Sequence, residues 1–263
     1  MEYQFVGGGN MGYALAAALI QQRICPASEI LVTDPTPEAR LRAEQLGCAT
    51  SDGVRRSDAR VVVLAVKPQQ APEVLRALAG RRDERQAVVS IMAGIRLATI
   101  REITGYSAVV RVMPNTPAQV GQGMNVYFAA PGVTAEQLVA VEALLTAAGK
   151  VLRVETEDLI DAATAVSGSG PAYVFYLAEH WMQAAIGMGF ADAQAALLVE
   201  QTIRGAAELW SKSGVSPATL RQQVTSKGGT TAAAIESMDR DGVGAAIELG
   251  VRRAYERAKE LGR

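Results

Sequence analysis

The sequence has little of several features that would point to a specialised class of protein. Its 263 residues include only two cysteines and one histidine, and 26 Lys and Arg residues balance 27 Asp and Glu residues. Two cysteines cannot make a disulfide framework, and Cys25 and Cys48 lack the spacing of a metal-ligand pair. We therefore expect a reducing, cytoplasmic location and no metal. Because balanced charge gives no positive field, we expect neither nucleic acid nor a membrane as a partner.

Long hydrophobic runs are also missing, although 49% of the residues are hydrophobic. Residues 162–178 contain no Asp, Glu, Lys, Arg or His, but Ser167-Gly168-Ser169-Gly170-Pro171 interrupts this stretch. A membrane span would be longer and more continuously apolar. The N-terminal residues have no basic region followed by an apolar one, so we expect no secretory signal. The composition is typical of a globular protein of one or two domains.

The first part of the chain alternates short β-branched runs with segments of helical periodicity. This alternation predicts a parallel sheet with crossover helices, a doubly wound α/β domain. Residues 61–66 are apolar at every position, which predicts a central strand that is buried on both faces. Strands are expected at 3–6, 30–33, 60–66, 87–92, 109–113, 125–129 and 151–154, and helices at 11–22, 37–46 and 135–147.

After residue 156 the β-branched runs give way to segments rich in Ala, Leu, Glu and Gln. We therefore predict a boundary between a domain of residues 1–156 and an all-helical domain of residues 157–263. Several segments, such as 193–203, are apolar on more than one helical face, which predicts oligomerisation through this domain. Helices are expected at 158–167, 172–188, 191–213, 218–224, 231–240 and 243–261.

A glycine-rich turn follows directly after the first expected strand. The segment Gly7-Gly8-Gly9-Asn10-Met11-Gly12 matches the pattern G-x-G-x-x-G. In that pattern Gly7 permits the tight turn, Gly9 lets the backbone approach a pyrophosphate, and Gly12 allows close packing of helix on strand. The N–H groups at the start of the following helix can hold the anion. The turn therefore predicts a bound dinucleotide; the alternative is a glycine-rich turn without a ligand.

Asp34 ends the second expected strand, 22 residues after Gly12. A carboxylate at this place accepts a hydrogen bond from the ribose 2′-hydroxyl of NAD and repels the 2′-phosphate of NADP. The sequence therefore favours NADH over NADPH, although Arg40 and Arg42 could reach a phosphate. Alternatively, Asp34 before Pro35 only starts a turn.

Two further segments end strands at the same expected edge of the sheet. Ala65-Val66-Lys67-Pro68 places Val66, Lys67 and Pro68 where ligands bind in this architecture. In Val112-Met113-Pro114-Asn115-Thr116-Pro117 the two prolines favour a rigid loop, so Pro114 and Asn115 are candidates for a wall of the cofactor cleft. The alternatives are a solvated surface lysine and a turn without ligand contact.

The helical half contains a second glycine-rich turn, Ser226-Lys227-Gly228-Gly229-Thr230-Thr231. Because it leads into a helix expected to begin near Thr231, successive N–H groups can converge on a small anion such as a carboxylate. A plain capping loop is the alternative, but that would use Ser or Thr without needing two glycines.

The sequence as a whole resembles the pyrroline-5-carboxylate reductase family, which catalyses the last step of proline biosynthesis. The segments that carry the resemblance are FVGGGNMG, VVVLAVKPQ, VRVMPNTPA, VSGSGPAYVF and VTSKGGTTAAAIE, in the family's order over essentially the full chain. The last two are the most specific. The chain departs from the family pattern at Lys227, where many members have proline, and at Gly12, where alanine is common.

The resemblance implies a Rossmann-type domain followed by an all-helical dimerisation domain. It also implies hydride transfer from NADH or NADPH to the C=N carbon of the cyclic imine 1-pyrroline-5-carboxylate, giving L-proline. The implied assembly is a homodimer that can associate further, up to a decamer. The substrate loop is expected against the nucleotide domain of the partner subunit.

The resemblance also implies roles for individual residues. The N–H groups of Gly229 and Thr230 would hold the substrate carboxylate, and the Thr231 hydroxyl would lie near the ring nitrogen. Ser226 and Gly228 belong to the same substrate loop. The cofactor set would include Ala93 and, bordering the nicotinamide, Ser169, Gly170 and Pro171.

Two competing functions make different demands on the sequence. A β-hydroxyacid dehydrogenase would use a lysine on the first long helix of the second domain as acid–base, but residues 172–188 contain no lysine. A nucleotide-binding sensor would need a basic recognition helix or an appended module, and we find neither in the sequence. The single histidine, His180, is expected to be structural or exposed rather than catalytic.

Overall fold

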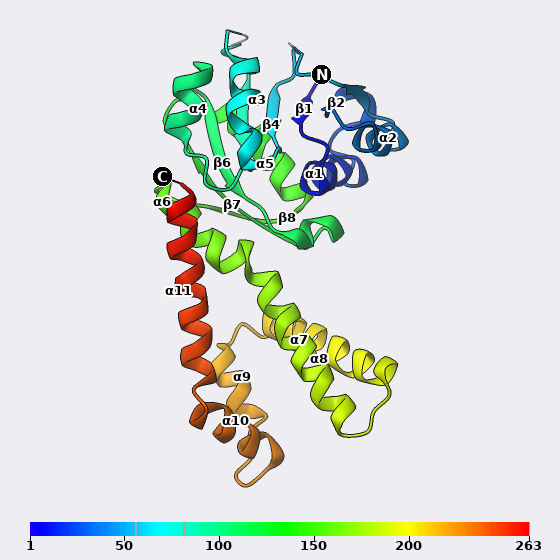
Figure 1. Ribbon diagram of the computed structural model, residues 1–263, viewed down its shortest axis with the longest axis vertical. Helices are drawn as coiled ribbons and strands as arrows, with labels where there is room; N and C mark the ends of the chain where they lie inside the picture. The colour runs from blue at the N-terminus through cyan, green and yellow to red at the C-terminus, as the bar shows by residue number, and fades with distance from the viewer. Residues whose placement is uncertain (56, 81–82, 263) are drawn as a thin grey trace. The chain divides into compact units, whose positions relative to one another are not determined.

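The computed structural model describes residues 1–55, 57–80 and 83–262, whose contacts define two compact units (Figure 1). Unit 1 comprises Met1–Pro171 and Arg253–Arg263, and unit 2 comprises Ala172–Arg252. The domain boundary expected after residue 156 rests on a change of composition and stays a prediction.

Unit 1 is built on an eight-stranded sheet of order β3-β2-β1-β4-β5-β6-β7-β8. Strands β1 to β6 pair in parallel; Tyr3 of β1 lies opposite Ile30 of β2 on one side and Val61 of β4 on the other. All four residues of β4 are buried, as predicted for a central strand. The strands are β1 (Tyr3–Val6), β2 (Ile30–Thr33), β3 (Ala49–Ser51), β4 (Val61–Leu64), β5 (Ala87–Ser90), β6 (Val109–Met113), β7 (Gly123–Ala129) and β8 (Gly149–Arg153).

The sheet is mostly parallel, as predicted, with one exception: β7 pairs antiparallel with β6. Only the short 3-10 segment η3 (Thr116–Val120) separates these two strands. A parallel connection needs a crossover of a dozen or more residues. A link as short as this one therefore reverses the chain direction. The edge strand β3 was not expected, because three residues are too few to show an alternating pattern.

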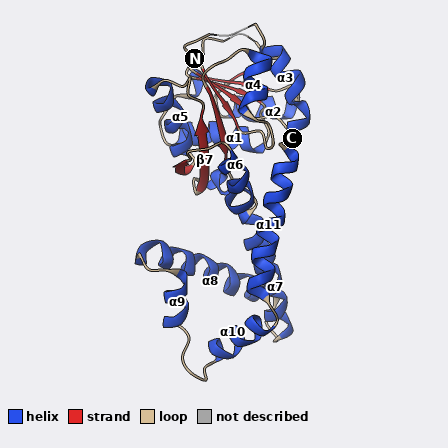
Figure 2. Cartoon of the chain, turned by 90° about the vertical axis from the view of Figure 1, so that its left-hand side faces the viewer, coloured by secondary structure: helices blue, strands red, loops and turns tan. Residues whose placement is uncertain are grey.

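Helices cover both faces of the sheet, as the doubly wound pattern predicts (Figure 2). On one face α1 (Asn10–Gln21) and α5 (Ala135–Ala147) bury Leu15 and Leu144 against the sheet. On the other face α3 (Ala71–Leu78) and α4 (Leu97–Thr104) bury Leu75 and Ile100. Each such side chain contributes about 1.5–3 kcal/mol of burial free energy. The remaining helix between strands is α2 (Pro37–Gln45), and short 3-10 turns form at η1 (Ala27–Glu29) and η2 (Pro68–Gln70).

The rest of the chain is helical. Within Ala172–Arg252 only Ala185, Ala195 and Val199 are buried hydrophobic residues, whereas Phe175 and Leu197 are 67% and 68% exposed. A unit with so much exposed apolar surface needs a further partner to cover it. The segments are α6 (Asp158–Ala163), the π-helical η4 (Thr164–Gly168), α7 (Gly170–Gly187), α8 (Asp192–Ser213), α9 (Pro217–Gln223), α10 (Thr230–Arg240) and α11 (Val243–Leu261). In the described part of the chain, none of the helices combines the length and the hydropathy needed to cross a bilayer.

Candidate active site

Two glycines of the segment after β1, Gly7 and Gly12, are packed so closely against backbone that a side chain is excluded at each. Gly7 has φ +109°, and a Cβ there would lie 2.6 Å from the carbonyl carbon of Ala65. A Cβ on Gly12 would lie 2.3 Å from the carbonyl oxygen of Gly7. Gly7 therefore requires glycine for its backbone conformation, and Gly12 leaves room for the close approach of helix to strand in this structure.

The N-terminus of α1 faces open space. Its N-cap is Gly9, no side chain caps it, and nothing described lies within 4 Å of a Cβ placed on Gly9. The first intrahelical hydrogen bond of the turn runs from the Tyr13 N–H to the Gly9 carbonyl. The N–H groups of Asn10, Met11 and Gly12 lie ahead of it and have no intrahelical acceptor, so they can bind an anion.

Asp34, at the end of β2, holds the glycine-rich loop. Its Oδ2 accepts a hydrogen bond from the Gly8 N–H at 2.7 Å, and its Oδ1 accepts one from the Thr36 N–H at 2.8 Å. The hydrogen bond from Thr36 shows that Asp34 starts a turn, which is the alternative role considered above. The hydrogen bond from Gly8 also places Asp34 beside the glycine-rich loop, where a ribose ligand would have to lie. Each carboxylate oxygen retains a lone pair for a ribose hydroxyl.

A cleft of about 410 Å³ at this edge of the sheet brings together several of the predicted cofactor residues. Among them are Gly7, Gly8, Gly9, Asp34, Val66 and Lys67, and the lining also includes Pro35, Thr36, Glu38, Ala39, Arg42, Ala65 and Gln70. Sequence reasoning missed Thr36 and Gln70, whose only signal was their place just after strands β2 and β4.

Arg42 and Arg40, both weighed as phosphate ligands, have different surroundings. The Arg42 guanidinium lies 4.3 Å from the centroid of the Tyr13 ring, and its Nη1 lies 3.4 Å from Asn10 Oδ1, beside the glycine-rich loop. Arg40 instead donates from Nη1 to the carbonyl oxygens of Asp34 and Pro35 at 2.8 Å. Arg42 is therefore the arginine available to a ligand in the cleft.

The segment after β4 forms a tight turn that contains the positively charged side chain of Lys67. Lys67 is exposed and lines the cleft, and its N–H donates to Gln70 Oε1 at 3.3 Å. Pro68 begins η2 and lies outside the set that lines the cleft. Lys67 is thus both a surface lysine and a residue of the cleft.

The other predicted cofactor residues of unit 1 also lie outside the cleft lining. Ala93 follows β5, and Pro114 and Asn115 follow β6. Asn115 is buried: its Nδ2 donates to the carbonyl oxygen of Ser167 at 3.0 Å, and its Oδ1 accepts from the Met124 N–H at 2.8 Å. Asn115 therefore supports the loop that it belongs to.

The predicted nicotinamide segment lies at a helix irregularity. Ser169 follows the π-helical turn η4, and its N–H donates to the carbonyl oxygen of Thr164 at 2.8 Å. Gly170 and Pro171 then open α7. Widened turns of this kind occur often at functional sites.

The second glycine-rich turn, in unit 2, also leads into a helix that no side chain caps. Helix α10 begins at Thr230, one residue earlier than predicted, and its N-cap is Gly229. Gly228 has φ +73°, and the Gly229 N–H donates to the carbonyl oxygen of Ser226 at 3.0 Å. Since the N-cap is a glycine, the first-turn N–H groups, Thr230 and Thr231 included, remain available to an anion.

His180 is exposed on α7, with its ring in an edge-on contact at 4.4 Å from the ring of Tyr176. No lysine occurs on α7, from Gly170 to Gly187. The acid–base lysine of the dehydrogenase alternative is therefore missing from this helix.

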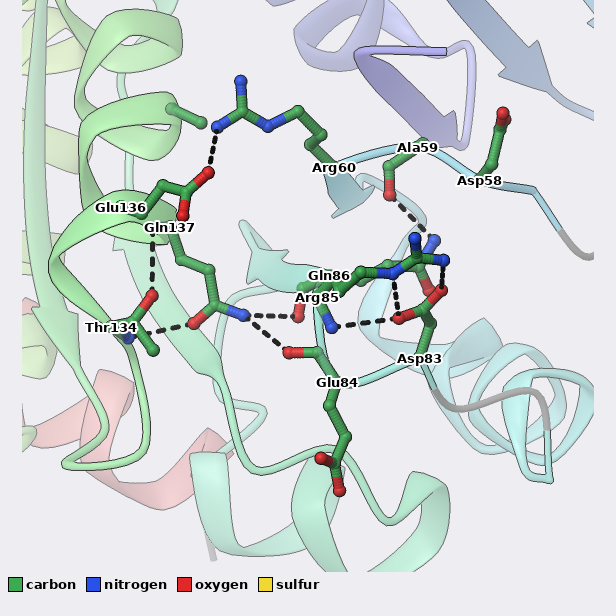
Figure 3. A pocket seen from close by; sticks show the side chains of 11 residues that line it. Asp58, Ala59, Arg60, Asp83, Glu84, Arg85, Gln86, Thr134, Glu136 and Gln137 are labelled. Atoms are coloured by element: carbon green, nitrogen blue, oxygen red, sulfur yellow. Dashed lines mark hydrogen bonds and ion pairs between the residues drawn. The ribbon is translucent and has the colours of Figure 1, made fainter.

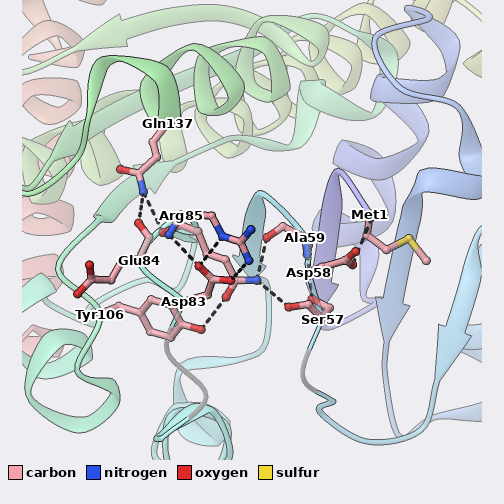
Figure 4. A network of polar contacts seen from close by, with 10 residues as sticks. Met1, Ser57, Asp58, Ala59, Asp83, Glu84, Arg85, Tyr106 and Gln137 are labelled. Carbon is pink, nitrogen blue, oxygen red and sulfur yellow. Dashed lines mark hydrogen bonds and ion pairs between the residues drawn. The ribbon is translucent and has the colours of Figure 1, made fainter.

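A second hollow, of about 380 Å³, lies at the opposite edge of the sheet, where β4 and β5 begin (Figure 3). At its floor Gln86 donates from Nε2 to the carbonyl oxygens of Ser57 at 2.9 Å and Ala59 at 2.8 Å, and its Oε1 accepts from the Tyr106 hydroxyl at 2.9 Å (Figure 4). Gln137 donates to the carbonyl oxygens of Glu84 and Gln86. These buried amides bond to the protein itself, so this network joins the segments before β4 and β5 to the start of α5.

Two family models match the chain. Residues 157–261 match the pyrroline-5-carboxylate reductase dimerisation model, and residues 2–94 match the model of NADP oxidoreductase, coenzyme F420-dependent.

Relatives match over nearly the whole length. The pyrroline-5-carboxylate reductase of Pseudomonas aeruginosa is 41% identical over 261 residues, which cover 98% of this chain and 95% of that protein. The enzyme of Arabidopsis thaliana is 34% identical, with 98% and 94% covered. The structure of a pyrroline-5-carboxylate reductase from Coxiella burnetii has a TM-score of 0.90 at 35% identity, covering 100% of this chain and 98% of that one. The Plasmodium falciparum enzyme, solved with NADP bound, has a TM-score of 0.89 at 28% identity, with 100% and 98% covered.

Proposed function

The chain belongs to the pyrroline-5-carboxylate reductase family, and we propose that it reduces 1-pyrroline-5-carboxylate to L-proline through the two glycine-led helix N-termini described above. It is an NAD(P)H-dependent oxidoreductase of proline biosynthesis. One observation carries the assignment of the site. Helices α1 and α10 each begin at an N-cap glycine without a side-chain cap, which leaves two anion sites for the two anionic reactants.

The first of these sites would bind the dinucleotide. The N–H groups at the start of α1 suit its pyrophosphate, and the Asp34 carboxylate suits the adenosine ribose. Arg42 and Lys67 place two cations on the same cleft, where they would compensate the negative charge of Asp34 toward a 2′-phosphate. The residues we assign to the cofactor are Gly7, Gly8, Gly9, Asn10, Met11, Gly12, Asp34, Val66, Lys67, Pro68, Ala93, Pro114, Asn115, Ser169, Gly170 and Pro171.

The second site would bind the substrate. Because the Gly229 N–H already donates to the carbonyl oxygen of Ser226, the N–H groups of Thr230 and Thr231 would hold the carboxylate of the imine, while Ser226, Gly228 and Gly229 shape the turn. The Thr231 hydroxyl would then lie near the ring nitrogen. Two contacts at opposite ends of a small rigid ring are enough to fix its orientation.

The chemistry demands little acid–base catalysis from the protein. Bound NAD(P)H supplies the hydride, and a protonated imine accepts it readily at its C=N carbon. What the residues must do is hold the two reactants in register and exclude water. This requirement agrees with a site of backbone N–H groups, one carboxylate and one hydroxyl, with His180 exposed on α7.

The protein is a homo-oligomer, because residues 157–261 match the family's dimerisation domain. We propose a dimer whose substrate loop completes the site with the partner's nucleotide domain, and further association up to a decamer. The two free cysteines, Cys25 and Cys48, support a reducing, cytoplasmic location.

The test is an assay of the full-length protein that follows NADH absorbance on addition of 1-pyrroline-5-carboxylate, with product identified as proline. We expect oxidation of one NADH per proline. Tight nucleotide binding without turnover of either NADH or NADPH would instead favour a nucleotide sensor and would contradict the proposal.

A further inference from the structure

Three residues along one face of β6 and its continuation contact the helical segment that leads to Ser169–Pro171. Arg111, Met113 and Asn115 alternate in an extended backbone, so their side chains point to the same side. Arg111 Nη2 lies 2.6 Å from Asp161 Oδ1 on α6, and Asn115 Nδ2 donates to the carbonyl oxygen of Ser167 at 3.0 Å. Between them Met113 packs on η4: its Cε would lie 2.9 Å from a Cβ on Gly168. The strand thus contacts α6 and η4 at successive points.

The first of these contacts is a buried ion pair. The side chains of Arg111 and Asp161 are each 2% exposed. Arg111 Nη1 also lies 3.2 Å from Glu157 Oε1, which in turn accepts the Leu97 N–H at 2.9 Å, at the start of α4. Arg96 Nη2 adds a contact to Asp161 Oδ2 at 3.3 Å. Both guanidiniums therefore act on the acidic residues at the start of α6.

Such a cluster is poorly explained by stability alone. Burying a carboxylate and a guanidinium costs as much as their attraction returns, and well-packed apolar side chains of similar volume often stabilise a protein as well or better. A guanidinium adds directional hydrogen bonds, because its two Nη groups donate in fixed directions. Asp161 and Glu157 must therefore lie where those two groups can reach them. The cluster therefore specifies where α6 lies on the sheet.

The position of α6 is transmitted directly to the residues after it. Helix α6 continues through η4 to α7. The orientation of α6 about its axis and its position along the sheet therefore determine where Ser169 lies. The π-helical bond from the Ser169 N–H to the Thr164 carbonyl is part of this path. Asn115, itself assigned to the cofactor wall, is hydrogen-bonded to the same turn at Ser167.

We propose that Arg111 and Asp161 are positioning residues for hydride transfer, which set the Ser169–Pro171 segment against the cofactor by fixing α6 on β6. This inference rests on the proposed function, in which that segment borders the nicotinamide. Neither residue touches the reactants, so their loss acts on the geometry of the bound state and not on the affinity of the adenosine half of the cofactor.

The experiment uses the full-length double variant Arg111→Met/Asp161→Leu, which replaces the ion pair with apolar side chains. Arg96 keeps its ion pair with Asp158, and Glu157 keeps the hydrogen bond from the Leu97 N–H. We expect kcat to fall about 10- to 100-fold, because misplacement of reacting groups by about 1 Å has effects of this size. The NADH dissociation constant, measured by fluorescence titration, should stay within about twofold, since the α1 N-terminus and Asp34 are untouched. A folded single variant Arg111→Met should likewise have a lower kcat and an NADH dissociation constant close to that of the wild type.

The matched control is Gln86→Met, which removes a buried hydrogen-bonding side chain of unit 1 at the opposite edge of the sheet. It should lower the melting temperature and leave kcat unchanged at temperatures well below unfolding. A folded double variant with a kcat like that of the wild type overturns the positioning role while the proposed function stands. A wild-type protein that oxidises neither NADH nor NADPH with the imine overturns both.

Discussion

The carboxylate of Asp34 accepts a hydrogen bond from the N–H of Gly8 at 2.7 Å, which ties the end of β2 to the glycine-rich loop after β1. The same carboxylate accepts the Thr36 N–H, so one side chain stabilises both the glycine-rich loop, to which we assign the pyrophosphate, and the turn after β2, to which we assign the ribose. On this assignment we expect cofactor preference and loop geometry to be coupled at Asp34.

Replacing Asp34 should shift the cofactor preference. Asp34→Ser removes the charge that repels a 2′-phosphate and one ribose hydrogen bond, so the ratio of kcat/KM for NADPH over NADH should rise by about 1–3 kcal/mol in free energy. Asp34→Asn is the control for the loop, since its amide oxygen can still accept the Gly8 N–H. An unchanged ratio in Asp34→Ser would show that Asp34 does not face the ribose.

Arg42 should matter to NADPH more than to NADH. Arg42→Met keeps the packing on Tyr13 and removes the charge beside Asn10, so the dissociation constant of NADPH should rise about 5- to 30-fold, with that of NADH little changed. Arg40→Met is the matched control, because Arg40 donates to backbone carbonyls of Asp34 and Pro35. Equal losses for both nucleotides in Arg42→Met would contradict a role at the 2′-position.

Thr231 should orient the imine. Thr231→Val keeps the branched shape and removes the hydroxyl, so we expect a loss of roughly 1–3 kcal/mol of transition-state stabilisation, about 10- to 100-fold in kcat/KM. The loss should appear in kcat more than in KM if the hydroxyl acts mainly in the transition state, and nucleotide affinity should barely move.

The alternative role for Thr231 is support of helix α10. That role predicts a lower melting temperature with near-normal kinetics. Both quantities are measured on the same preparation, and a destabilised variant with normal kcat/KM would remove Thr231 from the site. The glycine N-cap of α10 argues against a capping role.

The full chain should be at least a dimer at micromolar concentration, with a mass by light scattering of twice 27.7 kDa or more. Residues 1–155 alone should be monomeric and bind nucleotide weakly. Phe175→Glu should weaken the assembly by placing a charge on the apolar surface of α7. Val139→Glu on α5, at a side chain that is 68% exposed, is the matched control and should leave the mass unchanged. A monomeric full chain would contradict this prediction.

Stability should fall at alkaline pH. Burial raises the pKa of the Cys25 thiol to about 11 and that of the Tyr3 phenol to about 12, from ordinary values of 9.0 and 10.0. Because the pKa values are higher in the folded state, the stabilising contribution is complete below the unfolded values and is lost as the pH rises through the folded ones. Urea unfolding should therefore show a loss on the order of 2–3 kcal/mol between about pH 8 and about pH 10.5.

Tyr3→Phe separates this effect from a general sensitivity to alkali. The variant loses the hydrogen bond to the Ala140 carbonyl oxygen, which lowers its stability at every pH, but it can no longer ionise at this position. Its stability should therefore depend less steeply on pH than that of the wild type. Parallel curves for the two proteins would contradict the assignment of Tyr3.

Much of the fold could be predicted from local pattern. The continuous apolar run at Val61–Leu64 predicted a buried central strand, and the glycine pattern after Val6 predicted the turn into α1. These signals are local, because a strand buried on both faces and a turn without side chains each constrain consecutive residues. The direction of β7 was missed because pairing depends on how far the chain must travel between strands, which apolar periodicity does not record.

The sequence by itself determined the family, the order of the elements and the two glycine-led helix starts, because each depends on residues near one another in the chain. Only the tertiary structure decided between Arg40 and Arg42, since both lie on α2 and differ in what the fold places beside them. It also decided that Arg111 pairs with Asp161, 50 residues away. Such long-range partners follow from how strands and helices pack, and a charge on a strand does not by itself reveal which acid it will meet.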